Sequence, residues 1–298
     1  YGDMDVAEKL AWMDEAYLGK YEAIGLDSEI KLQKPFEKPI EVTHKYSISS
    51  TESEENNTYL SYNMVVGNAA DSQMAMAFEV LDYALLSAPG APLKQALLDV
   101  KAGKDVYGSY DDGILQPYFT VIAKGSNPDR KEEFVSVIRQ VLGDIVKNGI
   151  DRKAVEAGIN YFEFRYREAD FSSYPKGLMY SLDILGDWLY EKGNPFAQVQ
   201  QLTVFEKLKK AVNAGYFEEL IRKYLLENPH GCIMTLVPKK GLAAQREKEL
   251  ADRLEAYRSS LSDEQLEEMV RKTKALEAYQ ESEERPEDLE CIPMLKRS

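Results

Sequence analysis

The sequence predicts an α+β protein: a mostly antiparallel sheet with helices packed on one face, followed by a long charged αα-hairpin. Three observations lead to this prediction. Short runs rich in β-branched and aromatic residues alternate with long helical periods between residues 42 and 240. Pairs of long helices stand between strands, unlike the strict alternation of a doubly wound sheet. Beyond residue 240, apolar residues recur at helical spacings in a highly charged stretch.

The first 41 residues are predicted to form a helix and a linker. Helical periodicity runs from Asp5 to about Tyr21. The following stretch lacks periodicity and contains Pro35 and Pro39, which disfavour helix at and before their own positions. We therefore assign residues 1–25 to a first segment and 26–41 to an extended linker that precedes a new domain. Because the sequence begins with Tyr, we expect it to be a piece of a longer polypeptide.

Residues 42–240 supply the predicted sheet domain. Strands are predicted at TYLSYNMVVG, QPYFTVIAKG and GCIMTLVP, and EVTHKYSIS is strand-like. Helices are predicted at DSQMAMAFEVLDYALLSA, at GAPLKQALLDV, and at about 152–167, 175–190 and 204–226. A further helix begins at the Asn127 cap, with Pro128 in its first position, and ends before Gly149. The stretch GKDVYGSYDDG has no phosphate-loop or dinucleotide fingerprint and is predicted to be a flexible crossing.

Residues 241–285 are predicted to form the αα-hairpin. Ser262 and Gln265 occupy capping-box positions at the start of the second helix. The apolar stripe of the hairpin is narrow, so it needs a partner surface; its residues are Leu250, Leu254, Tyr257, Leu261, Leu266, Met269, Val270 and Leu276. Residues 286–298 are predicted to be a proline-bounded linker that leads into a further segment.

Composition excludes several classes of function. The 298 residues are 44% hydrophobic and 30% charged, as in ordinary globular proteins. Because 37 Lys and Arg stand against 51 Asp and Glu, the net charge is −14, which argues against nucleic-acid or membrane partners. No run reaches the roughly 20 apolar residues of a membrane span. Cys232 and Cys291 lack a disulfide pattern, which indicates a reducing compartment and predicts a cytoplasmic protein.

No catalytic constellation is visible among the reactive residue types. The two histidines, His44 and His230, cannot form an HxxEH or HxxH zinc motif. His230 and Cys232 are a possible ligand pair, yet two ligands do not make a site, and a turn histidine beside a buried thiol is the favoured interpretation. The 19 tyrosines could form a peptide-binding wall, but core packing is favoured.

The carboxylates of the sequence favour ion pairing over acid–base catalysis. Glu163 and Glu168 flank Arg165 and Arg167 at helical spacings, which favours ion pairs. No nucleophile elbow of the form GxSxG is present. We therefore predict no catalytic, cofactor-binding or metal-ligating residue in this chain.

Several stretches occur in a recognisable order: YGDMDVAEKLAWMDEAYLGKY, KPFEKPIEVTHKYSISS, LLSAPGAPLKQALLD, LQPYFTVIAKG, GIDRKAVEAGINYFEFRYRE, SSYPKGLMYSLDILGDWLY and LECIPMLK. In this order they resemble the insulinase/pitrilysin-type zinc metallopeptidases, in the presequence protease (falcilysin-like) branch. The resemblance covers essentially the whole chain. It runs from the end of the catalytic domain, through the second domain, to the helical hairpin that joins the two halves of such enzymes.

The resemblance also implies where the chemistry lies. Such enzymes have four homologous units in two halves that close around an unfolded peptide, and the first unit carries zinc on an HxxEH helix. The zinc site is thus expected upstream of Tyr1, and substrate contacts of the other half downstream of Ser298. Laid on this chain, the motif falls at Glu79-Val80-Leu81-Asp82-Tyr83, with Glu79 and Tyr83 at the ligand positions and Asp82 at the base. The alternative is an amphipathic helix with a coincidental sequence; both predict no zinc here.

These inferences predict a non-catalytic part of a zinc metalloendopeptidase that degrades short unstructured peptides. The chain would form part of the chamber wall and the hinge, and would be inactive alone. Its expected partners are the remaining domains of its own polypeptide and the peptide substrates, and zinc is expected only in the full-length parent. Two alternatives remain open. One is a stand-alone inactive scaffold or adaptor subunit, and the other is an unrelated enzyme whose carboxylates act without metal.

Overall fold

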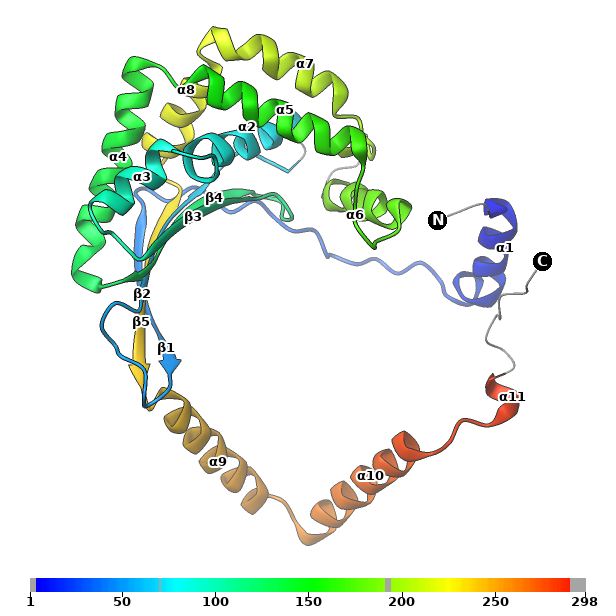
Figure 1. The fold of residues 1–298 in the computed structure, drawn as a ribbon. Helices are drawn as coiled ribbons and strands as arrows, with labels where there is room; N and C mark the ends of the chain where they lie inside the picture. Colours follow the sequence, from blue (N-terminus) through cyan, green and yellow to red (C-terminus); the bar gives the residue numbers. More distant parts are fainter. Residues whose placement is uncertain (1–3, 70, 191–193, 290–298) are drawn as a thin grey trace. The chain divides into compact units, whose positions relative to one another are not determined.

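The computed structural model describes residues 4–69, 71–190 and 194–289, and it divides the chain into two units, Tyr1–Lys239 and Lys240–Ser298 (Figure 1). The strands are β1 (Ile40–Ile48), β2 (Thr58–Val65), β3 (Asp105–Asp111), β4 (Tyr118–Ser126) and β5 (Gly231–Lys240). The helices of unit 1 are α1 (Val6–Ala16), α2 (Ser72–Asp82), α3 (Pro92–Asp99), α4 (Lys131–Asn148), α5 (Arg152–Glu168), α6 (Lys176–Trp188), α7 (Leu202–Ala211) and α8 (Tyr216–Leu220). Two π-helical turns, η2 (Tyr83–Ser87) and η6 (Ile221–Leu226), continue α2 and α8.

The five strands form one sheet in the order β1-β5-β2-β4-β3. The central strand β2 is antiparallel to both β4 and β5, and β3 is antiparallel to β4. The arrows of β1 and β5 point in the same direction in Figure 1. The predicted mostly antiparallel sheet is therefore confirmed.

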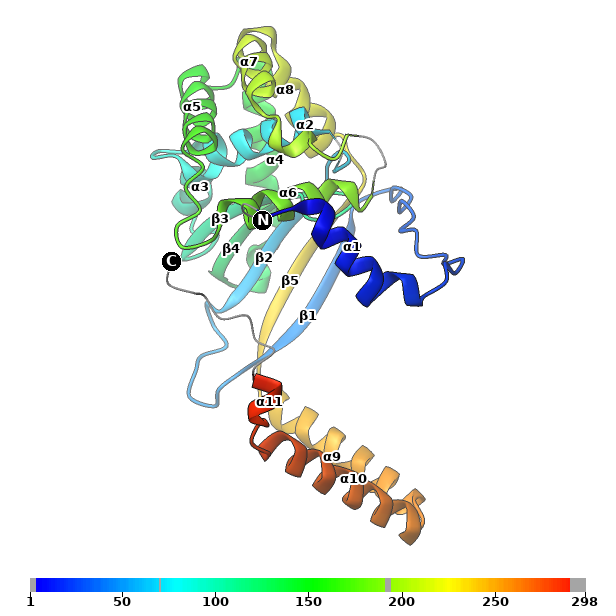
Figure 2. The same ribbon diagram turned by 90° about the vertical axis from the view of Figure 1, so that its right-hand side faces the viewer.

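The helices α2, α3, α4, α5, α7 and α8 cover one face of this sheet, as predicted, while α6 lies apart from this layer (Figures 1 and 2). Burial alternates along β2 with a period of two: Leu60, Tyr62 and Met64 are buried under the helices. The residues between them, such as Ser61 and Asn63, lie on the opposite face of the sheet and are half-buried. The sheet thus has a covered face and an open face.

The prediction of a flexible crossing at GKDVYGSYDDG is wrong, because this stretch contains the edge strand β3. Val106 and Tyr110 point into the core, and Gly108 lies between them. A Cβ added to Gly108 would lie 2.3 Å from Leu86 Cδ1 and 2.8 Å from the backbone oxygen of Thr120. Glycine therefore allows the helical layer to approach the strand closely. Because Gly108 has no side chain, it interrupts the alternation of apolar and polar residues from which a strand is predicted.

Helix ends follow the predicted punctuation with two differences. Asp71 caps α2, since its carboxylate accepts a hydrogen bond from the Met74 N–H at 2.9 Å. Gly149 ends α4 with a φ of +93°, a region that favours glycine. Asn127 does not cap its helix; its side chain bonds Asn56 instead. The first helix, α1, ends at Ala16 and is followed by a short 3₁₀ turn.

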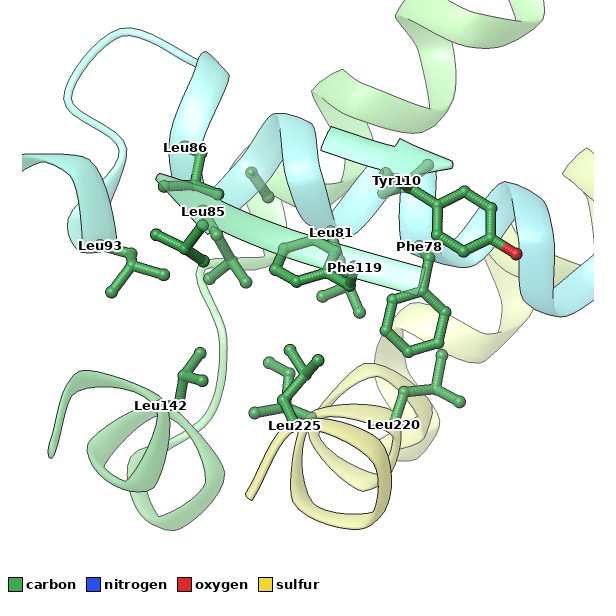
Figure 3. Packing of buried hydrophobic residues seen from close by; sticks show 14 of the residues in the cluster. Phe78, Leu81, Leu85, Leu86, Leu93, Tyr110, Phe119, Leu142, Leu220 and Leu225 are labelled. Atoms are coloured by element: carbon green, nitrogen blue, oxygen red, sulfur yellow. The ribbon is translucent and has the colours of Figure 1, made fainter. Parts of the chain in front are cut away.

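The core is built around the ring of Phe78 on α2 (Figure 3). This ring stacks on Tyr110 of β3 with centroids 5.6 Å apart, and it lies 6.0 Å from the rings of Phe119 and Tyr224. Leucines of α2, α3, α4 and α8 complete the cluster in Figure 3. Burial of these large apolar rings stabilises the domain.

Tyrosines contribute less to this core than predicted. Tyr62 is fully buried, and its hydroxyl donates to the Leu225 carbonyl oxygen at 2.7 Å. Tyr110 is also buried. Most of the other described tyrosines are half-buried or exposed, so the expectation that tyrosine serves mainly the core is wrong.

Unit 2 contains the predicted αα-hairpin, formed by α9 (Leu242–Ser260) and α10 (Asp263–Glu281), and a short helix α11 (Pro286–Leu289). The predicted capping box at Ser262 and Gln265 is present. Apolar side chains of α9 and α10 line a groove of about 490 Å³ and stay about half exposed, among them Leu254, Tyr257 and Val270. Cys291 and most of the predicted linker at 286–298 lie outside the described residues.

We expect Phe78→Ala to lower the free energy of unfolding by about 3–5 kcal/mol, because it removes a buried ring that contacts three other rings. Phe164→Ala on α5 is the matched control, since that ring is 64% exposed, and its effect should stay within about 0.5 kcal/mol. Urea unfolding followed by circular dichroism measures both. Equal losses in the two variants would contradict the assignment of Phe78 to the centre of the core.

Candidate functional site

The helix α2 places Glu79, Asp82 and Tyr83 on one face, since residues at i, i+3 and i+4 lie together on a helix. The Oδ2 atom of Asp82 accepts a hydrogen bond from the Ser87 hydroxyl at 3.0 Å. Its Oδ1 atom is buried and has no hydrogen-bond partner among the described residues. Asp82 is therefore held by a neighbouring turn of its own segment.

Tyr83 is held by aromatic packing. Its ring stacks on Tyr161 of α5 with centroids 5.4 Å apart and an interplanar angle of 16°. It also meets the ring of Phe162 edge-on at 6.5 Å. A Cβ added to Gly158 of α5 would lie 3.0 Å from the Tyr83 ring, so glycine lets the two helices approach. The second ligand position of the motif is thus part of a helix–helix contact.

Glu79 has a strongly perturbed pKa. Burial, with smaller contributions from the charges of Asp112 and Asp82, raises the pKa of this carboxyl to about 7, and the charge of Arg165 opposes the shift. Burial also raises the pKa of Asp82, while its bond from Ser87 opposes that shift. Glu79 therefore exchanges its proton near neutral pH, which a solvated glutamate does not do.

Two further carboxylates come from distant parts of the sequence. Asp112 lies in the loop between β3 and β4, and Asp183 lies on α6. Partial burial raises the pKa of both, although both residues are exposed at the surface, so the main perturbation stays with Glu79 and Asp82. The sequence could not point to this group, because nothing in local spacing relates a loop and a helix about 70 residues apart.

The arrangement around α2 does not resemble a metal centre. Within residues 4–69, 71–190 and 194–289, no group of three or more His, Cys, Asp or Glu side chains is placed to hold a metal ion. Carboxylates that retain protons near neutral pH are also poor metal ligands, because a ligand must give up its proton to bind.

The remaining candidates lie elsewhere on the sheet domain. His44 is exposed on β1. His230 is 5% exposed in the turn before β5, and Cys232 is half-buried at the start of the strand, where burial raises the pKa of its thiol. The structure places His230 and Cys232 on the lining of the same cavity. A third metal-binding side chain does not join them in the described part of the chain.

The predicted ion pairing on α5 is present for Glu163. This carboxylate pairs with Arg167 at 2.7 Å and with Lys209 of α7, a partner that sequence spacing could not identify. Arg165 instead lies over the ring of Tyr161, 5.7 Å from its centroid. These pairs join α5 to α7 and do not form a catalytic pair.

The turn that holds His230 is fixed by one side chain. Asn228 donates from Nδ2 to the carbonyl oxygens of Val65 at 2.6 Å and of Tyr224 at 3.1 Å. Its Oδ1 atom accepts the His230 N–H at 2.9 Å. His230 is therefore positioned by bonds to both β2 and η6, which fixes the imidazole at the end of the sheet.

Comparison with known proteins identifies the family. A family model described as "Peptidase M16 inactive domain" matches residues 1–162. The chain belongs to the peptidase M16 family. A second model, for the region associated with subfamily C of these peptidases, matches residues 236–298 and so covers the hairpin. The predicted relation to insulinase-type peptidases is confirmed.

Curated relatives of this M16 chain include presequence proteases. Protein HypA of Clostridium perfringens is 40% identical over 99% of the chain, and the match covers 30% of that protein. Presequence protease 1 of Arabidopsis thaliana is 31% identical over 99% of the chain, which covers 28% of that protein. The chain therefore spans about a third or less of the length of these relatives.

Solved structures show the same fold at low identity. A protease from Helicobacter pylori has a TM-score of 0.53 at 14% identity, over 80% of this chain and 54% of that chain. The peptidase M16 inactive domain from Pseudomonas fluorescens has a TM-score of 0.50 at 16% identity, over 80% of this chain and 52% of that chain. No helix among the described residues is both long and apolar enough to cross a membrane.

We expect Glu79→Gln to remove a pH dependence of stability. The pKa of Glu79 is about 7 in the folded state and 4.5 in the unfolded state. Below pH 4.5 the carboxyl is protonated in both states and does not change the free energy of unfolding. Above pH 7 it is ionised in both states, and the burial of its charge lowers the free energy of unfolding by the full amount. The stability gain of the variant over wild type should grow by about 2 kcal/mol from about pH 5 to about pH 8.

Urea unfolding at the two pH values measures this gain. Glu156→Gln on α5 is the matched control, since that glutamate is exposed and its gain should not change with pH. A constant gain for Glu79→Gln would show that Glu79 ionises like a solvated carboxyl.

Proposed function

We propose that this chain is a non-catalytic segment of a zinc metalloendopeptidase that degrades short unstructured peptides. The observation that supports the proposal is that α2 of this M16 chain packs in the core without a histidine at Glu79, Asp82 or Tyr83, which the family resemblance aligns with the three metal-site positions. Two of these side chains are committed elsewhere, Asp82 to Ser87 and Tyr83 to Tyr161. The zinc and the general base would then belong to the longer polypeptide.

The open face of the sheet supports a role as part of the chamber wall. A sheet face without a helical layer presents side chains of several strands side by side, which suits contact with an extended peptide. Half-buried or exposed aromatic residues, Tyr59, Tyr107 and Tyr118, alternate with polar ones there. Tyrosine combines a large apolar area with a polar tip, as peptide-contacting surfaces require. The partners would be the remaining domains of the polypeptide and the peptide substrate.

The composition of unit 2 supports a role as a hinge. The hairpin forms a compact unit of its own, and its apolar stripe stays about half exposed. Elements that move between packed states have few buried contacts of their own. A short capped turn at Ser262 joins α9 to α10, so the two helices can act as one arm between halves of a larger enzyme.

We expect the 298-residue chain to hold far less than one zinc ion per molecule after dialysis. We also expect no hydrolysis of a quenched unstructured peptide, with or without added zinc, because the ligand positions carry no histidine. Metal analysis and a fluorescence assay, with a full-length presequence protease as the positive control, measure the two quantities. One bound zinc together with chelator-sensitive hydrolysis would overturn the proposal.

Amide hydrogen exchange tests the hinge. Amides of residues 245–280 should exchange much faster than those of β2 and β4, because the helices of the hairpin bury little apolar surface. The strands serve as the internal reference in the same experiment. Protection of the hairpin equal to that of β2 would mean that it is a rigid extension instead of a hinge.

A further inference from the structure

A cavity of about 470 Å³ lies at the end of the sheet, between the linker and the open face. Its volume falls in the range of small-ligand sites. The apolar residues of its lining are Ile30, Phe36, Val65, Ile114, Leu115 and Tyr118. No carboxylate is among its lining residues in the described part of the chain, although the protein as a whole is strongly acidic. Tyr190 also lines the cavity, and Lys31 is the one charged residue among its described lining residues, so most of the lining favours apolar ligand groups.

One polar group of this cavity is the imidazole of His230. The residue is 5% exposed, and neither ring nitrogen has a hydrogen-bond partner among the described residues. Burial lowers the pKa of His230, so the ring is neutral, with one donor and one acceptor nitrogen. Buried polar atoms without partners are rare and costly, so a ligand that supplies a hydrogen bond here gains affinity.

The linker already places an aromatic ring on this imidazole. Phe36 meets His230 edge-on, with ring centroids 4.8 Å apart and an interplanar angle of 80°. A phenylalanine ring has no group that can bond the nitrogens of His230. Phe36 therefore covers His230 and leaves its hydrogen-bonding capacity unused.

The main chain of the linker is held three residues before this ring. The Gln33 N–H donates to Oε1 of Gln116 at 2.6 Å, and Nε2 of Gln116 donates to the Gln33 carbonyl oxygen at 3.2 Å. One side-chain amide thus binds both main-chain groups of an extended residue, independently of that residue's side chain. Ile30 and Leu32 beside it remain 62% and 59% exposed, so the linker is lightly packed.

We propose that this cavity is a binding site for an extended peptide with an aromatic side chain three residues after a main-chain contact to Gln116, and that Gln33–Phe36 occupy it as a built-in competitor. The favoured ligand residue is tyrosine, because its hydroxyl offers His230 the hydrogen bond that Phe36 cannot. The site rests on the proposed role of the chain as a peptide-contacting wall and gives that wall a side-chain preference.

Three acetylated and amidated peptides test the site: KLQKPFEK, which copies the linker, and its variants KLQKPYEK and KLQKPAEK. Each carries a fluorescein label, and fluorescence anisotropy gives its affinity for the full 298-residue chain. Tethering keeps the linker at a high effective concentration, so wild type should bind all three weakly. Phe36→Ala should bind the phenylalanine peptide at least about 10-fold more tightly than wild type, the tyrosine peptide tighter still, and the alanine peptide no better than wild type does.

Variants on the cavity side separate the contacts. Gln116→Leu, added to Phe36→Ala, should weaken both aromatic peptides about 10-fold, because the main-chain bonds are lost. His230→Phe, in the same background, should abolish the preference for tyrosine over phenylalanine and leave the phenylalanine peptide bound. Leu32→Ala is the matched control in the linker, since that side chain does not line the cavity, and it should behave like wild type.

Nitrogen-15 histidine NMR shows whether each variant is folded and where the peptide binds. The chain has two histidines, so the exposed His44 serves as the internal reference, and only the His230 resonances should shift on binding. The proposal is overturned if Phe36→Ala binds no tighter than wild type, or if the alanine peptide binds as well as the aromatic ones. Retained zinc or hydrolysis would instead overturn the proposed function, and this binding assay involves neither.

Discussion

The packing of one face of α2 against the sheet is the interaction on which the rest of the domain depends. Phe78 meets the rings of β3, β4 and η6, and Leu81 and Leu85 extend the same buried stripe. Because a helix turns about 100° per residue, this choice of buried face fixes where Glu79, Asp82 and Tyr83 must point. The direction in which these three positions face is therefore set by hydrophobic packing, whatever side chains stand there.

The side chains at that position decide what it does. In an HxxEH helix, two neutral imidazoles bind zinc and a glutamate acts on the bound water. Here a stacked tyrosine and two carboxylates with raised pKa values occupy the same face. The tyrosine adds a helix–helix contact, while the carboxylates lower stability when ionised. The helix thus contributes to the packing of the domain, and its segment 79–83 contains no histidine.

The two faces of the sheet follow different physical rules. The covered face is filled by interdigitated apolar side chains and tolerates little change in volume. The open face carries half-buried tyrosines, hydroxyls and amides, and near one end it meets the linker and the neutral His230. The two ring nitrogens of His230 are held in place without a hydrogen-bond partner among the described residues. A ligand that bonds such a nitrogen gains affinity.

Periodicity and punctuation determined most of the local structure. The helices around Phe78 and Phe134, the strand of Leu60 and Tyr62, and the capping box at Ser262 could all be predicted from spacing and end signals. The order of these motifs also identified the family. One strand, β3, was missed because Gly108 interrupts its alternation, and only the helical layer above it explains that glycine.

Tertiary structure alone decided the sites. Sequence spacing is a local signal, so it could place Glu79 and Asp82 on one helix face but could not bring Asp112 close enough to raise the pKa of Glu79. Sequence spacing also could not predict the cavity. There Gln116 bonds Gln33, 83 residues away in the sequence, and Phe36 contacts His230, which lies near the other end of the domain's sequence. Such contacts arise from the pairing of the strands and the path of the linker, because only folding brings residues so distant along the chain within bonding distance.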